Sequence, residues 1–251
     1  MFNPFIYSPA INFLSYRNAG VEAVFYDLGQ LTEADTQNLQ QDTAKPSDYV
    51  LYLPNEPVLL LNSPNECALA LNGQPFDVCL AGVGSSTLGV AAMLKQVAKQ
   101  NSRAGIGVIS DFGLLNFQFD LGRYMWSTGG FGSSSKPDEG SMLPDEGSCQ
   151  SLVDLLVCDD LDLREVVAHS RGAYLLRESL RLAGPKVFEK HSGFKIITLG
   201  GVVDFEEGAD VTQYIGELDW VGRLYSDLSI EHENVRYCGH HLNPSLPASM
   251  P

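Results

Sequence analysis

From residue 76 onward, the chain alternates short apolar runs with stretches of helical composition. The apolar runs end in glycine or polar residues and predict buried strands, namely FDVCLAGVG (76–84), AGIGVISDFG (104–113), LREVVAHS (163–170), KIITLGGVVDF (195–205) and NVRYCGHHLNP (234–244). Residues 87–100 and 171–184 carry apolar stripes at helical spacing, which predict helices. Because parallel strands need a crossover, this alternation favours the α/β class, with a mostly parallel central sheet and helices on both faces.

The rest of the chain carries weaker signals. Residues 1–75 read as a β-rich N-terminal extension, with strands at VEAVFYDLG (21–29) and PVLLLN (57–62). Residues 31–48 are polar and predict a loop or a short exposed helix. Residues 114–150 combine aromatic residues with a Gly/Ser-rich stretch, which is typical of a lid or of a mobile insertion. We therefore expect one domain over residues 1–251.

Composition restricts the partners of this chain. The net charge of −15 repels phosphate backbones and anionic lipids, so we expect no nucleic-acid partner. The five cysteines are scattered without a C-x-x-C pair, which argues against a disulfide framework or a zinc site. The N-terminus lacks a basic region, and no run of 18 apolar residues exists, so we expect a cytoplasmic protein that does not span a membrane. Its oligomeric state stays open.

The segment Ala168-His169-Ser170-Arg171-Gly172 joins a predicted strand to a predicted helix. A serine becomes a nucleophile when a sharp strand-to-helix turn exposes it beside a base, and this turn needs small residues two positions before and after the serine. Ala168 and Gly172 meet that need. We therefore expect Ser170 to be a nucleophile, with the amide of Arg171 as one oxyanion-hole donor at the start of the helix.

A second oxyanion donor is expected from the loop that follows an earlier strand. The glycine-rich segment 82–85 occupies that place, and glycines let the backbone approach a substrate oxygen closely. We therefore expect Val83 and Gly84 to contribute to the oxyanion hole, although packing alone could also explain the glycines.

The base and its acid are expected after the serine, in the order Ser, Asp or Glu, His. His191 lies just beyond a predicted helix, and His232 lies in a charged cluster. His240 follows Gly239, which permits a tight loop at the end of the last strand, so it is the preferred base, with His241 as the alternative.

Two aspartates compete for the role of the acid. Asp204 ends the predicted strand 195–205, whereas Asp219 is followed by Trp220 and Val221, an apolar pair that could bury the carboxylate beside an imidazole. We therefore prefer Asp219, which would fix the tautomer of the histidine and stabilise the imidazolium.

The order AHSRG, IITLGG, GELDWV and a late histidine resembles the lipase class 3-like α/β-hydrolases. That family has a Gly-His-Ser-x-Gly elbow, a Thr-Phe-Gly strand, an Asp-x-Val acid and a terminal histidine. Here Ala168 replaces the first glycine, and the proline that often follows the Thr-Phe-Gly strand is missing. The resemblance covers the chain from residue 76 on and implies an α/β-hydrolase fold in which Ser170, Asp219 and His240 act on an ester without a cofactor or metal.

Two other functions compete with this serine esterase. Gly82, Gly84 and Gly89 form a loose dinucleotide fingerprint, and Asp111 could bind a ribose, which would indicate an NAD-type oxidoreductase domain. The third hypothesis is an inactive hydrolase fold that serves as a binding module. The first hypothesis requires a small-molecule ester or acyl substrate.

Overall fold

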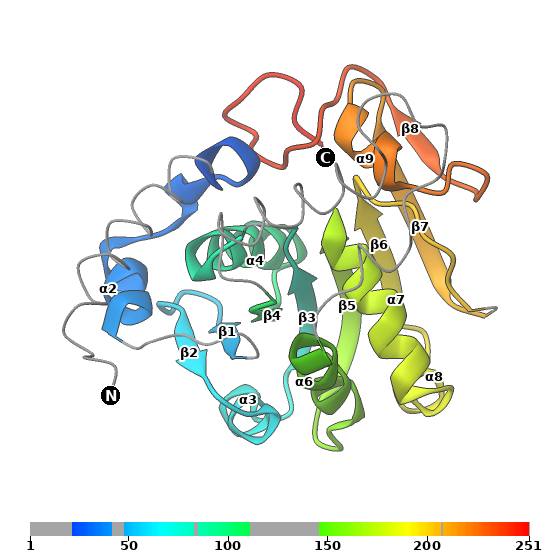
Figure 1. Ribbon diagram of the computed structural model, residues 1–251. Helices are drawn as coiled ribbons and strands as arrows, with labels where there is room; N and C mark the ends of the chain where they lie inside the picture. The colour runs from blue at the N-terminus through cyan, green and yellow to red at the C-terminus, as the bar shows by residue number, and fades with distance from the viewer. Residues whose placement is uncertain (1–21, 42–47, 83–84, 111–145, 207, 251) are drawn as a thin grey trace, which may run out of the picture.

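The computed structural model describes residues 22–41, 48–82, 85–110, 146–206 and 208–250. The described residues form a sheet in the order β2-β1-β4-β3-β5-β6-β7-β8 (Figure 1). Its strands are β1 (Tyr49–Tyr52), β2 (Leu59–Leu61), β3 (Pro75–Leu80), β4 (Ala104–Val108), β5 (Asp162–His169), β6 (Lys195–Leu199), β7 (Asp210–Gly216) and β8 (Glu233–Val235).

The sheet is mixed, but most of its neighbouring strands are parallel. β1 pairs antiparallel with β2 and β4, and every pair from β4 to β8 in the sheet order is parallel. The chain therefore belongs to the α/β class, as its alternating pattern predicts. The carboxyl ends of β5, β6, β7 and β8 meet at one edge, which is where parallel sheets collect functional side chains.

Helices cover both faces of the sheet, and each face has its own apolar core. One core contains residues of α3 (Pro64–Leu71), α6 (Glu146–Val157), α7 (Arg171–Ala183) and α8 (Lys186–Lys190). The other core contains residues of α2 (Glu33–Gln41) and α4 (Thr87–Asn101), together with Tyr26, Leu242 and Met250. Both termini of the described chain therefore pack on the α4 face, where the blue and red segments lie side by side in Figure 1.

The strand predicted at residues 21–29 is absent from the described residues, and two strands lie where none was predicted. Residues 22–25 are helical and η2 (Leu28–Gln30) is a 3-10 turn, so no strand forms in the described part of this segment. Strands β1 and β7 were not predicted; β1 is the four-residue apolar run YVLY, and β7 carries a polar sequence, DVTQYIG. The strand predicted at 57–62 is β2, and α2 lies within the polar stretch 31–48.

α2 is less exposed than its polar sequence suggests. Its Asp35 is fully buried and forms an ion pair with Lys95 of α4. Of the predicted lid or insertion at 114–150, only 146–150 lie within the described residues, and they begin α6.

Candidate active site

Ser170 lies on a sharp turn between β5 and α7. Its backbone has φ 53° and ψ −120°, a conformation that non-glycine residues rarely adopt. A Cβ on Gly172 would collide with the carbonyl oxygen of Leu80 in β3, so the first turn of α7 reaches its position only because residue 172 is glycine. The glycine at the second small position of the motif therefore has a direct steric cause.

His240 lies between Ser170 and Asp219. Its Nε2 is 2.9 Å from Oγ of Ser170, and its Nδ1 is 2.8 Å from Oδ2 of Asp219. The carboxylate can only accept a hydrogen bond, so Nδ1 carries the proton and Nε2 accepts from the serine hydroxyl. The three side chains come from the carboxyl ends of β5, β7 and β8, where the parallel register brings distant segments together.

Asp219 is buried and held from several sides. It is 0% exposed, and its Oδ1 accepts a 2.6 Å hydrogen bond from the amide of Gly222 at the start of α9 (Trp220–Tyr225). Its second oxygen is therefore left for His240. Asp204, the competing acid, is exposed.

The other histidines have different surroundings. His241 directs its Nε2 to the carbonyl oxygen of Pro247, at 2.9 Å, and so turns away from Ser170. Buried His191 bonds to the carbonyl oxygen of Leu156, and His232 bonds to that of Ile230.

The predicted oxyanion-hole residues are only partly within the described chain. Arg171 is the first residue of α7, directly after Ser170. Val83 and Gly84 lie outside the described residues. The amide of Gly82, the residue before Val83, donates a 2.8 Å hydrogen bond to Oη of Tyr26 and is therefore not available to a substrate oxygen.

Two buried residues that sequence reasoning missed lie directly behind the site. The Nδ1 of His169 is 2.8 Å from Oη of Tyr26, and its Nε2 is 3.1 Å from the carbonyl oxygen of His240. Burial, with the nearby His240 as a smaller cause, holds the pKa of His169 well below its usual range, so the ring is neutral. Burial likewise raises the pKa of Tyr26, which stays protonated. The four-residue spacing of Glu22 and Tyr26 fits one side of a helical turn and could have indicated Tyr26. The strand predicted at residues 21–29 concealed this spacing.

The start of α4 already holds a carboxylate of this chain. Glu22 accepts hydrogen bonds from the amide and the hydroxyl of Ser86, the N-cap of α4. A dinucleotide pyrophosphate binds at such a helix N-terminus in the nucleotide-binding folds. The position that the dinucleotide hypothesis requires is therefore occupied, and Asp111 lies outside the described residues.

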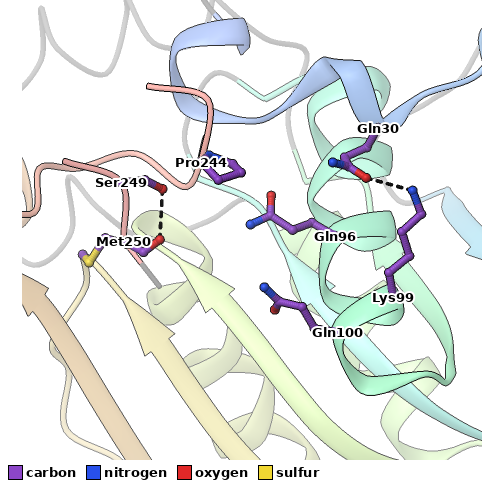
Figure 2. A pocket seen from close by; sticks show the side chains of 7 residues that line it. All are labelled: Gln30, Gln96, Lys99, Gln100, Pro244, Ser249 and Met250. Atoms are coloured by element: carbon purple, nitrogen blue, oxygen red, sulfur yellow. Dashed lines mark hydrogen bonds between the residues drawn. The ribbon is translucent and has the colours of Figure 1, made fainter. Parts of the chain in front are cut away.

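A hollow of mixed polar and apolar lining exists on the α4 face, away from the serine site. Figure 2 shows Gln96, Lys99 and Gln100 of α4 opposite the C-terminal segment, with none of Ser170, Asp219 or His240 among the lining residues.

Within the described ranges, no group of three or more His, Cys, Asp or Glu side chains is placed to hold a metal ion. Within the same ranges, no helix is long and apolar enough to cross a membrane.

Comparisons with known proteins include a weak similarity to a solved structure. No protein-family model matches the chain, and no curated protein matches it. Among solved structures, the crystal structure of esterase PE8 is similar with 18% sequence identity and a TM-score of 0.39, over 68% of this chain and 86% of that chain.

Proposed function

We propose that this chain is a serine hydrolase of the α/β-hydrolase fold that cleaves carboxylic esters, with Ser170, His240 and Asp219 as its catalytic triad. The observation that carries the proposal is the continuous hydrogen-bonded series from Oγ of Ser170 through His240 to buried Asp219. Its three members come from segments far apart in the chain, and the serine has the strained backbone that nucleophile elbows require.

In the proposed reaction, Oγ of Ser170 attacks the carbonyl carbon of the ester while Nε2 of His240 takes its proton. The tetrahedral oxyanion is stabilised by the amide of Arg171 and by a donor from residues 83–84. Collapse of this intermediate breaks the bond to the alcohol, which takes the proton from His240 and leaves an acyl-serine. Water, activated by the same histidine, then releases the acid and restores Ser170.

Asp219 has two tasks in this reaction. It keeps the proton of the resting imidazole on Nδ1, and it stabilises the imidazolium that forms when Ser170 loses its proton. Its complete burial strengthens the interaction, because little solvent screens it. The chemistry needs no cofactor, and a small ester with an acyl group is the substrate class that the resemblance to lipase class 3-like enzymes implies.

The test combines a covalent probe with turnover of p-nitrophenyl acyl esters. We expect a fluorophosphonate to label Ser170 in the wild type and not in Ser170→Ala, and turnover to be lost in that variant. Ser179→Ala is the matched control, because Ser179 is a buried serine of α7, the helix that follows Ser170, and its hydroxyl bonds to the carbonyl oxygen of Cys149. This control variant should keep both the fluorophosphonate labelling of Ser170 and the turnover of p-nitrophenyl esters. Labelling that persists in Ser170→Ala would refute the proposal, and a wild type that is folded but unlabelled would favour the inactive binding module.

A further inference from the structure

One helical turn near the N-terminus contacts the residues that follow β3, the residue before Ser170 and the segment that carries His240. Residues 22–25 are helical, and the amide of Tyr26 donates to the carbonyl oxygen of Glu22. The side chains of Glu22 and Tyr26, four residues apart, therefore lie on the same side of the turn. Both are buried, at 2% exposure each, although this segment is distant in sequence from all three triad residues.

The turn holds the loop that leads from β3 into α4. Oη of Tyr26 accepts hydrogen bonds from the amide of Gly82, at 2.8 Å, and from the hydroxyl of Ser85, at 3.1 Å. Glu22 holds the next residue, Ser86, through its amide and its hydroxyl. The two ends of the segment expected to form part of the oxyanion hole are thus tied to one turn.

The same turn holds the segment that carries the base. The amide of Leu242 donates to the carbonyl oxygen of Phe25 at 2.8 Å, and the side-chain amide of Asn243 donates to that of Ala23 at 2.6 Å. In Figure 1 the red C-terminal segment accordingly lies beside the dark blue turn. The ring of Phe25 also meets the ring of His240 edge to face.

The two hydrogen bonds of the His169 ring have directions that follow from what its partners can donate and accept. The carbonyl oxygen of His240 can only accept, so Nε2 of His169 must carry the proton that it donates. Nδ1 of neutral His169 then accepts from Tyr26, whose oxygen already receives two donors and uses its single proton for this bond. Tyr26 therefore selects the tautomer of His169, and that tautomer holds the backbone of the base.

We propose that Tyr26 and His169 are positioning residues for the proposed hydrolysis, which hold Gly82, Ser85 and the His240 backbone in fixed register with Ser170. Neither side chain touches the substrate, and both act through the groups to which they bond. The inference rests on the proposed function, because it requires that Ser170 and His240 react. Small displacements of reacting groups are costly, so the effect appears in kcat and not in KM.

The first test removes one hydroxyl. Tyr26→Phe keeps the ring and loses the oxygen that joins Gly82, Ser85 and His169. We expect kcat for a p-nitrophenyl ester, and the rate of fluorophosphonate labelling, to fall by about tenfold to a hundredfold while KM changes little. Tyr49→Phe is the matched control, because it removes another buried hydroxyl, which donates to the carbonyl oxygen of Ser151 at 2.9 Å on the opposite face. It should lose stability and keep kcat.

The second test separates the two nitrogens of His169. The amide of a glutamine reaches toward the Nε2 position and can still donate to the carbonyl oxygen of His240, whereas the shorter asparagine reaches only the Nδ1 position. We therefore expect His169→Gln to retain more of kcat than His169→Asn. The control is His191→Asn, which removes the equivalent bond from a buried histidine to the carbonyl oxygen of Leu156 and should leave kcat unchanged.

The outcomes distinguish this inference from the proposed function. If the wild type labels at Ser170 but Tyr26→Phe labels and turns over at the wild-type rate, the positioning role is refuted and the hydrolase proposal stands. If Tyr26→Phe does not fold, the two His169 variants decide, and equal kcat values in them would refute the role. A folded wild type that does not label at Ser170 refutes both proposals.

Discussion

Nδ1 of His240 lies 2.8 Å from Oδ2 of Asp219, and the carboxylate of Asp219 has no exposure to solvent. We expect Asp219→Asn to lower kcat by about four orders of magnitude with a small change in KM, because the amide no longer stabilises the imidazolium and favours the wrong tautomer. Steady-state kinetics measure the effect. Asp204→Asn, which changes the exposed competing aspartate, is the control and should behave as wild type. Similar losses in both variants would contradict the assignment of the acid.

His240 and His241 are adjacent in sequence but point to different partners, His240 to Ser170 and Asp219 and His241 to Pro247. We expect His240→Ala to lower kcat by at least about a thousandfold, since Ser170 loses its base. His241→Ala removes only the bond to the carbonyl oxygen of Pro247, so kcat should stay within about threefold of wild type, equivalent to less than 1 kcal/mol. Parallel kinetic assays with thermal unfolding of both variants check this. A larger loss of kcat in His241→Ala would reverse the choice of base.

Gly200, directly after β6, leaves no room for a side chain beside the triad. A Cβ there would lie 2.9 Å from Nδ1 of His240 and 3.0 Å from Oδ2 of Asp219, and its φ is +68°. Gly193→Ala is a matched control, because its φ is +81° and its Cβ would meet nothing within 4 Å. Both variants should lose about 1–2 kcal/mol in urea unfolding from the left-handed backbone. Only Gly200→Ala should lose activity, by about a hundredfold, and equal activities would show that the close packing is unimportant.

The neutral, buried His169 makes the fold sensitive to acid. Burial lowers its pKa well below 6.5, so below that pH the unfolded chain binds a proton that the folded chain does not. The contribution of His169 to stability is therefore complete above pH 6.5 and declines as the pH falls, by up to about 1.4 kcal/mol per pH unit. Urea unfolding at pH 8 and pH 5.5 measures it. The fall between these two values should be smaller in His169→Gln, and an equal fall would contradict the prediction.

Asp35 and Lys95 form a buried ion pair that joins α2 to α4. Burial alone would raise the pKa of Asp35. Hydrogen bonds from Lys95 and from the amides of Thr32 and Val58 instead bring this pKa down to about 2. We expect Asp35→Ala to destabilise the fold by about 3–5 kcal/mol, because it leaves the ammonium group buried and unpaired.

The half-exposed pair of Arg164 and Asp162 provides the control for that experiment. Asp162→Ala should cost less than about 1 kcal/mol in the same urea unfolding assay, because solvent screens an exposed pair. Comparable losses in the two variants would show that burial does not set the energy of the α2–α4 pair.

Local sequence patterns predicted the strands and helices whose formation depends mainly on residues close together in the chain. The strands around 76–80 and 162–169, and the helices that follow them, are readable because apolar runs and helical stripes need only a few consecutive positions. The polar strand β7 has no such run, since only three of its seven residues are buried. The turn at residues 22–26 was predicted to be a strand, because VEAVFYDLG has β propensity and the side chains of Glu22 and Tyr26 bond to segments distant in sequence.

By itself, the sequence determined the class of the fold, the elbow at Ser170 and the order in which an acid and a base must follow it. Those depend on local sterics and on chain order. Only the tertiary structure shows that Asp219 and His240, and not Asp204 and His241, are bonded in series with Ser170, because each pair differs in burial and direction and not in chemistry. It also brought Tyr26 behind the site, through hydrogen bonds that join residues 143 positions apart.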